Sequence, residues 1–146
     1  MSVVSYRTIV VATDGSEAGD RAVSTARSLA GEARSRVVVV HVNQMMGGRR
    51  GFFPVYANEE ELQDKIRHQV RGLKLDGVEA ELKVHRIANG HPARPIADDA
   101  RAIKADLIVT GNSRRGRLAG LFFGGVTQEL IRIATCPVLT VPRLAR

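Results

Sequence analysis

The feature that most constrains the fold is an alternation of short apolar runs with helical patterns along the chain. The runs are rich in β-branched residues, and four of them are almost continuously apolar, which is typical of strands buried on both faces of a parallel sheet. The run over residues 78–86 alternates instead, which predicts an edge strand with one exposed face. The runs are TIVVAT (8–13), RVVVVHV (36–42), VEAELKVHR (78–86), DLIVTG (106–111) and PVLTVP (137–142).

Apolar residues at helical spacing separate these runs. Ser16 stands where it would cap the first helix, and Asn58 with Glu61 resembles a capping box at the second. The order βαβαβαβαβ predicts an α/β fold, an open doubly wound five-stranded parallel sheet with helices on both faces. A chain of 146 residues fits a single domain over residues 1–146. The periodic positions are Ala22, Ala26, Leu29 and Ala30; Leu62, Ile66, Val70 and Leu73; Ile96, Ala100 and Ile103; and Val126, Leu130, Ile133 and Ala134.

The segment over residues 43–57, NQMMGGRRGFFPVYA, is too long for a simple turn. It combines glycines, a proline and several apolar side chains without a clear period. We interpret it as a variable surface loop, because connecting segments of this composition usually run over the protein surface. A functional lid or an interface loop is the alternative interpretation.

The net charge of +7 raises the question of a nucleic-acid partner. The basic residues are spread along the chain, however, and four phenylalanines and two tyrosines are too few for a base-stacking platform. We therefore do not expect nucleic acid as a partner. No apolar stretch approaches the roughly 18 residues of a membrane span, so we expect no membrane partner either.

The single cysteine, Cys136, cannot form an intrachain disulfide, which fits a reducing compartment. We therefore expect a cytoplasmic protein. For Cys136 itself we favour a small buried hydrophobe over a redox switch, because it directly precedes the last apolar run.

The site is expected at the carboxyl ends of the strands, where ligands bind in open α/β sheets. This rule selects TDGS (13–16), HVNQ (41–44) and the loop that follows DLIVTG. Asp14 could accept ribose hydroxyls or hold a metal ion there; alternatively, it caps the turn at Gly15 or the first helix. No side chain in the expected crevice forms a nucleophile–base pair, so we do not expect a dedicated enzyme.

The histidines do not indicate a metal centre. His85 and His91 have no cysteine or carboxylate partner at metal-ligand spacing, so we expect no zinc site. His41 lies inside an apolar run, and we expect it to be packed in the core and not catalytic.

The loop after the fourth run, GNSRRGRLAGLFFGGV, is glycine-rich and lies between an expected strand and an expected helix, as phosphate loops do. Its Gly111-x4-Gly116 spacing is that of a P-loop. Arg117, however, replaces the required lysine, and Leu118 replaces the metal-binding serine or threonine. We therefore exclude a P-loop, and the first strand is not followed by a G-x-G-x-x-G fingerprint.

Several segments, in their order and spacing, carry a resemblance to a known family. They are IVVATDGS, the pair His41–Val42, GHPARPIADDARAIKADLIVTG, LAGLFFGGVTQEL and TCPVLTVP. Together they resemble the universal stress proteins along nearly the whole chain. We expect the strand order 3-2-1-4-5 in an adenine nucleotide alpha hydrolase-like fold. The resemblance also implies a homodimer through the last strand, at Val138, Leu139, Thr140 and Val141.

Nucleotide-binding members of this family carry G-x2-G-x9-G-[ST] after the fourth strand, and this chain keeps part of that motif. Gly111 and Gly124 match its first and third glycines, whereas Arg114 stands at the second and Gly125 at the hydroxyl position. Losing the hydroxyl costs on the order of 1 kcal/mol and keeps the backbone N–H and the helix N-terminus. Arg114 either blocks a phosphate or binds it through its guanidinium, unless the loop is simply solvated.

The resemblance implies an adenine nucleotide as ligand, namely ATP, AMP or cyclic AMP, with Mg²⁺ or Mn²⁺ at Asp14 only when nucleotide is present. A branch of the family binds no nucleotide. We therefore expect a stress-response or regulatory homodimer, with a nucleotide-free protein-interaction module as the alternative. Slow ATP hydrolysis by a metal-held water at Asp14 is left open. The expected ligand-binding residues are Thr13, Asp14, Val42, Gly111, Asn112, Arg114, Arg115, Gly116, Gly124, Gly125 and Val126.

Overall fold

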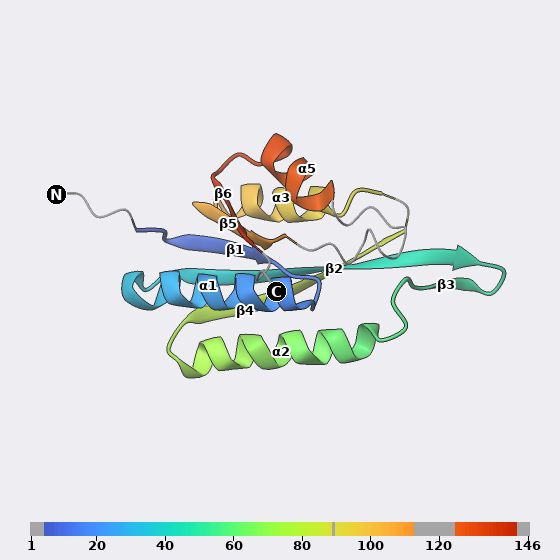
Figure 1. Ribbon diagram of the computed structural model, residues 1–146, viewed down its shortest axis with the longest axis horizontal. Helices are drawn as coiled ribbons and strands as arrows, with labels where there is room; N and C mark the ends of the chain where they lie inside the picture. The colour runs from blue at the N-terminus through green and yellow to red at the C-terminus, as the bar shows by residue number, and fades with distance from the viewer. Residues whose placement is uncertain (1–4, 89, 113–124, 143–146) are drawn as a thin grey trace.

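The computed structural model describes residues 5–88, 90–112 and 125–142 (Figure 1). Strands and helices alternate along it, as the apolar runs predict, with one additional strand. The elements are β1 (Thr8–Ala12), α1 (Glu17–Ala33), β2 (Arg36–Gly48), β3 (Gly51–Pro54), α2 (Glu59–Leu75), β4 (Glu79–Ala88), α3 (Ala93–Ala102), β5 (Leu107–Gly111), α5 (Val126–Ile133) and β6 (Val138–Val141).

The parallel part of the sheet has the order β4-β2-β1-β5-β6. β1 lies at the centre, where Ile9 is opposite Val37 of β2 and Leu107 of β5. This is the predicted order 3-2-1-4-5, and it is confirmed. The order reverses between β1 and β5, which places the carboxyl ends of these two strands at the point where such sheets bind ligands.

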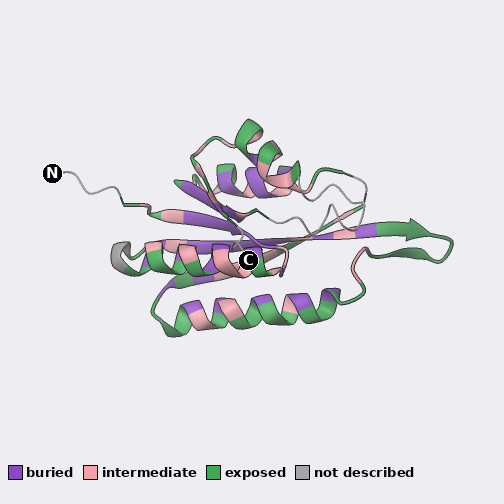
Figure 2. Ribbon diagram, viewed as in Figure 1, coloured by how far each residue is buried: buried purple, intermediate pink, exposed green. Residues whose placement is uncertain are grey.

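Two helical layers enclose the sheet, with α1 and α2 on one face and α3 and α5 on the other (Figure 1). Side chains of β1 point alternately to the two layers, so Ile9 packs with α1 and α2, whereas Val10 packs with α3 and α5. Buried residues therefore run without interruption along the central strands (Figure 2). The predicted α/β fold with helices on both faces is confirmed. Of the helices described, none is long and apolar enough to cross a membrane.

The interpretation of residues 43–57 as a surface loop was wrong. β2 continues to Gly48, and after a turn at residues 49–50 the chain returns as β3, antiparallel to β2. We call residues 45–54 the hairpin arm; it extends away from the helical layers, and most of it is exposed (Figures 1 and 2). The sequence did not reveal these strands because glycines interrupt the apolar alternation there. The two strands pair through the hairpin, with Gly47 opposite Phe52.

The two predicted helix caps have different outcomes. The Ser16 hydroxyl accepts a hydrogen bond from the Gly19 N–H at 3.2 Å, so the cap of α1 is confirmed. Asn58 precedes α2 as predicted, but its side chain makes no capping hydrogen bond. The capping box at Asn58 and Glu61 was therefore wrong, and the start of α2 is held by other contacts.

Candidate functional site

A cleft opens at the carboxyl ends of β1 and β5, where the strand order reverses, and Val40 and Val42 from the middle of β2 also line it. The first turns of α3 and α5 complete its walls. Its apolar lining comes from strands and helices, and its polar side chains come mainly from the ends of β1 and β5. The lining residues are Ala12, Thr13, Asp14, Gly19, Val40, Val42, Pro92, Ile96, Thr110, Gly111, Val126 and Thr127.

Five of the predicted ligand-binding residues lie together in this cleft. They are Thr13, Asp14, Val42, Gly111 and Val126. Residues of the predicted segments TDGS and HVNQ therefore lie beside the end of β5 and the start of α5. The segment HVNQ is not a loop as predicted, because it lies inside β2.

Other predicted residues have different positions. Asn112 is exposed and is not part of the cleft lining; its backbone N–H donates to the Val141 carbonyl at 3.0 Å. Gly125 is exposed and directly precedes α5, but it does not line the cleft. The remaining predicted residues lie outside the described part of the chain; these are Arg114, Arg115, Gly116 and Gly124.

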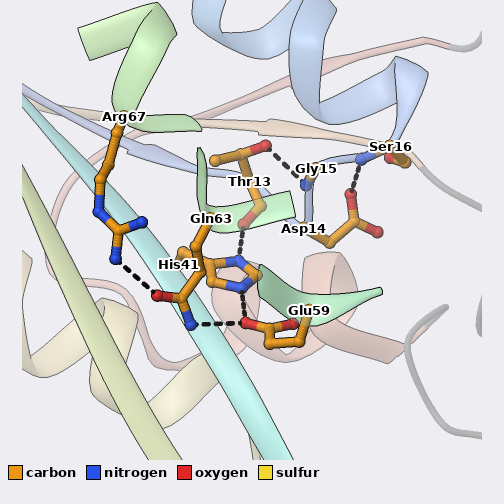
Figure 3. A network of polar contacts seen from close by, with 8 residues as sticks. All are labelled: Thr13, Asp14, Gly15, Ser16, His41, Glu59, Gln63 and Arg67. Carbon is orange, nitrogen blue, oxygen red and sulfur yellow. Dashed lines mark hydrogen bonds and ion pairs between the residues drawn. The ribbon is translucent and has the colours of Figure 1, made fainter. Parts of the chain in front are cut away.

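The Asp14 turn, residues 13–16, is closed by its own side chains (Figure 3). The Gly15 N–H donates to the Thr13 hydroxyl at 3.1 Å, and the Ser16 N–H donates to Oδ1 of Asp14 at 2.9 Å. Gly15 has a φ of +80°, a conformation that glycine adopts without strain. Oδ1 of Asp14 thus holds the turn, while Oδ2 accepts no hydrogen bond from the described residues and remains available to a ligand.

The N-terminus of α1 packs tightly against β5 in the site. A Cβ atom at Gly111 would stand 2.3 Å from the Ala18 carbonyl oxygen, so no larger residue fits there without moving the helix. Gly111 therefore allows the close approach that brings the start of α1 to the cleft. This is a packing reason for the first glycine of the motif, independent of any phosphate.

Sequence reasoning missed the part of the lining that comes from helices. Pro92 and Ile96 stand at the start of α3, and Thr127 lies in the first turn of α5, where its hydroxyl donates to the Gly111 carbonyl at 3.4 Å. The rule about strand ends selects loops after strands and does not say which helix turns cover them. A usable signal was the segment GHPARPI, in which Pro92 directly precedes a helix that must start at this edge.

A buried polar pair lies beside the Asp14 turn (Figure 3). His41 is buried as predicted, but it is not only packed: Nδ1 donates to the Thr13 carbonyl at 2.9 Å, and Nε2 lies 2.6 Å from Oε1 of Glu59. Gln63 donates to the same carboxylate oxygen at 3.0 Å. Glu59 was missed because an acidic residue in the first turn of a helix normally indicates a solvated helix start.

The pKa of His41 reflects this environment. Burial, the largest single influence, lowers it, but hydrogen bonds to Glu59 and Thr13 and the negative charges of Glu59 and Asp14 raise it. The net result is a pKa above the ordinary value of 6.5, so the pair favours a protonated ring. A charged imidazole buried against a carboxylate is a strong hydrogen-bonding unit.

Within the described residues, no group of three or more His, Cys, Asp or Glu side chains is placed to hold a metal ion. Asp14 offers one carboxylate, so a metal ion there would need phosphate oxygens for most of its ligands. Cys136 is half-buried and packs against the core on the α3 and α5 side; burial, with a smaller effect of Asp106, raises the pKa of its thiol. A raised thiol pKa opposes nucleophilic reactivity.

Comparison with known proteins places this architecture in a family. The profile of the Universal stress protein family matches residues 5–142. A universal stress protein from Thermus aquaticus is 33% identical over 139 residues, which cover 93% of this chain and 98% of that protein. The solved structure of a universal stress protein from Archaeoglobus fulgidus in complex with dAMP has a TM-score of 0.65 and 27% identity, covering 94% of this chain and 98% of that one.

A second solved structure, a universal stress protein in complex with cAMP, has a TM-score of 0.64 and 24% identity over 95% of this chain and 98% of that one. At this identity the likeness demonstrates a common fold. The family profile covers nearly the whole chain, and the relative from Thermus aquaticus is matched over almost its full length. The chain therefore belongs to the universal stress protein family.

Proposed function

We propose that this protein binds an adenine nucleotide in the cleft and acts as a stress-response regulator, with the nucleotide as a ligand and not as the substrate of a dedicated enzyme. The observation that carries the proposal is the Asp14 carboxylate: Asp14 lines a cleft at the strand-order reversal, and its Oδ2 accepts no hydrogen bond from the described residues. Related proteins of the same fold have been solved with dAMP and with cAMP, which supports an adenine nucleotide as the ligand class.

The lining divides the cleft into parts that suit the parts of a nucleotide. Val40, Val42 and Ile96 offer apolar surface for a base, and the backbone of β2 beside them offers polar groups. Asp14 stands where ribose hydroxyls would donate to its carboxylate. Gly111 and the first turn of α5 also line the cleft, and backbone N–H groups at a helix N-terminus favour phosphate.

The proposed phosphate end includes the arginines of the loop after β5. Arg114 and Arg115 are proposed to bind phosphate through their guanidinium groups, which would offset the missing second glycine and hydroxyl of the motif. ATP, AMP and cyclic AMP all fit this proposal. A Mg²⁺ or Mn²⁺ ion would share Asp14 with the phosphates and would be held only together with the nucleotide.

The proposed assembly is a cytoplasmic homodimer through β6. Among the described strands, β6 lies at the edge of the sheet and pairs only with β5. Leu139 is partly exposed at this edge, which supports burial of Val138, Leu139, Thr140 and Val141 by a second copy. Leu139→Lys should therefore yield a monomer in light scattering. Val84→Lys on β4, the opposite edge, is the matched control and should leave the mass unchanged.

The nucleotide proposal is tested by calorimetric titration of nucleotide-stripped protein with ATP, AMP and cyclic AMP, with and without Mg²⁺. We expect micromolar binding of at least one of them. Asp14→Asn keeps an acceptor for the Ser16 N–H but loses the charge, and should weaken binding roughly tenfold to a hundredfold. Asp64→Asn, an exposed aspartate on α2, is the control. No heat with any nucleotide would favour the nucleotide-free interaction module.

A further inference from the structure

The first two turns of α2 hold the Asp14 turn from the side opposite the cleft. His41 alternates along β2 with Val40 and Val42, which line the cleft, so its ring points to the other face of the sheet. From that face Nδ1 reaches the Thr13 carbonyl, and Glu59 of α2 reaches Nε2. The turn that carries the Asp14 carboxylate is therefore held, from the face of the sheet opposite the cleft, by side chains that do not line the cleft.

Two further contacts join α2 to the same turn. Lys65 donates from Nζ to the Gly15 carbonyl at 3.0 Å and to Oδ2 of Asp20 at 2.6 Å. Leu62 packs so closely below Gly15 that a Cβ atom there would lie 2.7 Å from the Leu62 Cδ2 atom. Of the polar contacts, the one through His41 is the most buried: the side chains of His41 and Glu59 are 3% and 5% exposed, whereas that of Lys65 is 44% exposed.

The His41 contact begins where the backbone ladder stops. β1 and β2 are in register up to Ala12 and Val40, and the Thr13 N–H still donates to the Val40 carbonyl at 3.1 Å. The Thr13 carbonyl then accepts from the His41 ring. A side chain thus fixes the last peptide group before Asp14, at a point where no backbone N–H of the described residues donates to the Thr13 carbonyl.

The protons in this arrangement are determined by chemistry. A carbonyl oxygen only accepts, so Nδ1 of His41 carries a hydrogen atom. Nε2 and Oε1 of Glu59, at 2.6 Å, must share one proton, either as imidazolium and carboxylate or as neutral ring and carboxylic acid. In both forms Nδ1 donates to Thr13, and Glu59 keeps the ring in the plane that makes this possible.

We propose that His41 is a positioning residue of the nucleotide site: it fixes the Thr13 carbonyl and thereby the direction of the Asp14 carboxylate, while Glu59 orients its ring. The inference rests on the proposed function, in which Asp14 accepts ribose hydroxyls. An apolar residue would continue the core of β2 at a lower desolvation cost, so a buried ionisable pair here needs a reason besides packing.

Two substitutions separate positioning from packing. His41→Asn keeps a donor close to the place of Nδ1, where it can reach the Thr13 carbonyl, but loses the contact to Glu59. His41→Gln keeps a polar group close to the place of Nε2, where it reaches Glu59, but loses the donor to Thr13. Both remove the imidazole ring and its charge and introduce a neutral amide, and they differ from each other by one methylene group.

The readout is discrimination for the ribose hydroxyls, the ratio of Kd for 2′,3′-dideoxy-AMP to Kd for AMP, measured by calorimetry. We expect a ratio of roughly ten in the natural protein, equivalent to one good hydrogen bond. His41→Asn should keep this ratio, and His41→Gln should lower it toward one. Asp14→Ala should lower it as well. Equal ratios for the two His41 variants would overturn the proposal, because a purely structural role weakens both ligands alike.

A second measurement does not depend on nucleotide binding. In the ligand-free protein, NMR hydrogen exchange of the Gly15 and Ser16 amides reports whether the Asp14 turn is held closed. His41→Gln should accelerate both amides severalfold, and His41→Asn should not. Glu59→Ala, which removes the group that orients the His41 ring, replaces His41→Gln if that variant does not fold, and should also accelerate both amides severalfold.

The two proposals fail in different ways. If the natural protein binds no nucleotide, the proposed function fails, and the exchange rates alone decide whether His41 holds the turn. If the protein binds AMP but the two His41 variants share one ratio and one set of exchange rates, the proposed function stands and the positioning role is refuted.

Discussion

The two halves of β2 belong to one strand but are stabilised in different ways. Residues 37–40 have a strand on each side and helices over each face, and their side chains are fully buried. In the hairpin arm, residues 46–48 are paired with β3, and Phe52 opposite them is 65% exposed. The first half is a strand because burial leaves its backbone no other partners. The arm is a strand because of its turn and its cross-strand contacts.

His41 lies between the half of β2 that is stabilised by burial and the half that is stabilised by pairing within the hairpin arm. It is the buried polar residue that follows the last fully buried valine, Val40, and its partner Glu59 starts the helix that follows the arm. The comparison therefore predicts that substitutions in the buried pair lower the free energy of unfolding most, substitutions in the core half of β2 lower it less, and substitutions in the arm lower it least.

The largest effect is expected from breaking the buried pair. His41→Ala leaves the Glu59 carboxylate in the core without the imidazole and should lower the free energy of unfolding by about 3–5 kcal/mol. Urea denaturation at neutral pH measures this difference. The exposed His68 on α2 is the control, and His68→Ala should change stability by no more than about 0.5 kcal/mol. A loss at His41 as small as that at His68 would mean that the pair is not buried in solution.

The next effect concerns the core half alone. Val39 is fully buried between β1, β4 and the α1 and α2 layer, so Val39→Ala should cost about 2 kcal/mol from lost burial and the cavity left behind. Val84 on the edge strand β4 is 37% exposed, and Val84→Ala should cost about 0.5 kcal/mol. Equal losses in the two variants, measured by the same denaturation, would contradict the assignment of β2 to the centre and β4 to the edge.

This gradient explains what the sequence could predict of the fold. Continuous valine runs such as residues 37–40 imply burial on both faces, and that condition almost determines a parallel sheet with two helical layers. The arm escaped prediction because Gly47, Gly48 and Gly51 break the period. Its order depends on Phe52 lying opposite Gly47, a contact that exists only after the hairpin has formed.

The residues of the site likewise divide into those that the sequence could predict and those that it could not. Thr13 and Asp14 were predictable, because they follow β1 at the reversal of strand order, where open α/β sheets bind ligands. Val42 was predicted as well, although β2 does not end there but continues to Gly48. Glu59 was not, because its role depends on His41, 18 residues earlier in the chain, and no local pattern marks a charged residue for burial. A contact between side chains that are distant in the sequence becomes visible only in the three-dimensional structure.

The third prediction is a dependence on pH. The folded-state pKa of His41 lies above its ordinary value of 6.5, so the folded protein binds this proton more tightly than the unfolded chain does. The resulting stabilisation is fully present below about pH 6.5 and is lost as the pH rises through the folded-state pKa. The stability difference between the natural protein and His41→Gln should therefore shrink at alkaline pH in urea titrations. A difference that grows with pH would show that the folded protein holds the ring neutral.

The smallest global effect is expected in the hairpin arm. Phe52 and Phe53 cover glycines of the opposite strand, with ring atoms 3.3 Å and 2.7 Å from where a Cβ of Gly47 or Gly48 would stand. Such cross-strand contacts contribute about 0.2–1 kcal/mol each, and they act only within the arm.

Replacing both rings, in Phe52→Ser with Phe53→Ser, should therefore leave the unfolding free energy within about 1 kcal/mol of the natural value. The amides of residues 46–53 should exchange faster, because the arm opens locally without the rest of the sheet. Amides in residues 37–40 should keep their protection, since their partners are β1 and β4. Exchange that accelerates in both halves together would mean that the arm and the core half of β2 unfold as one unit, and that burial alone does not separate them.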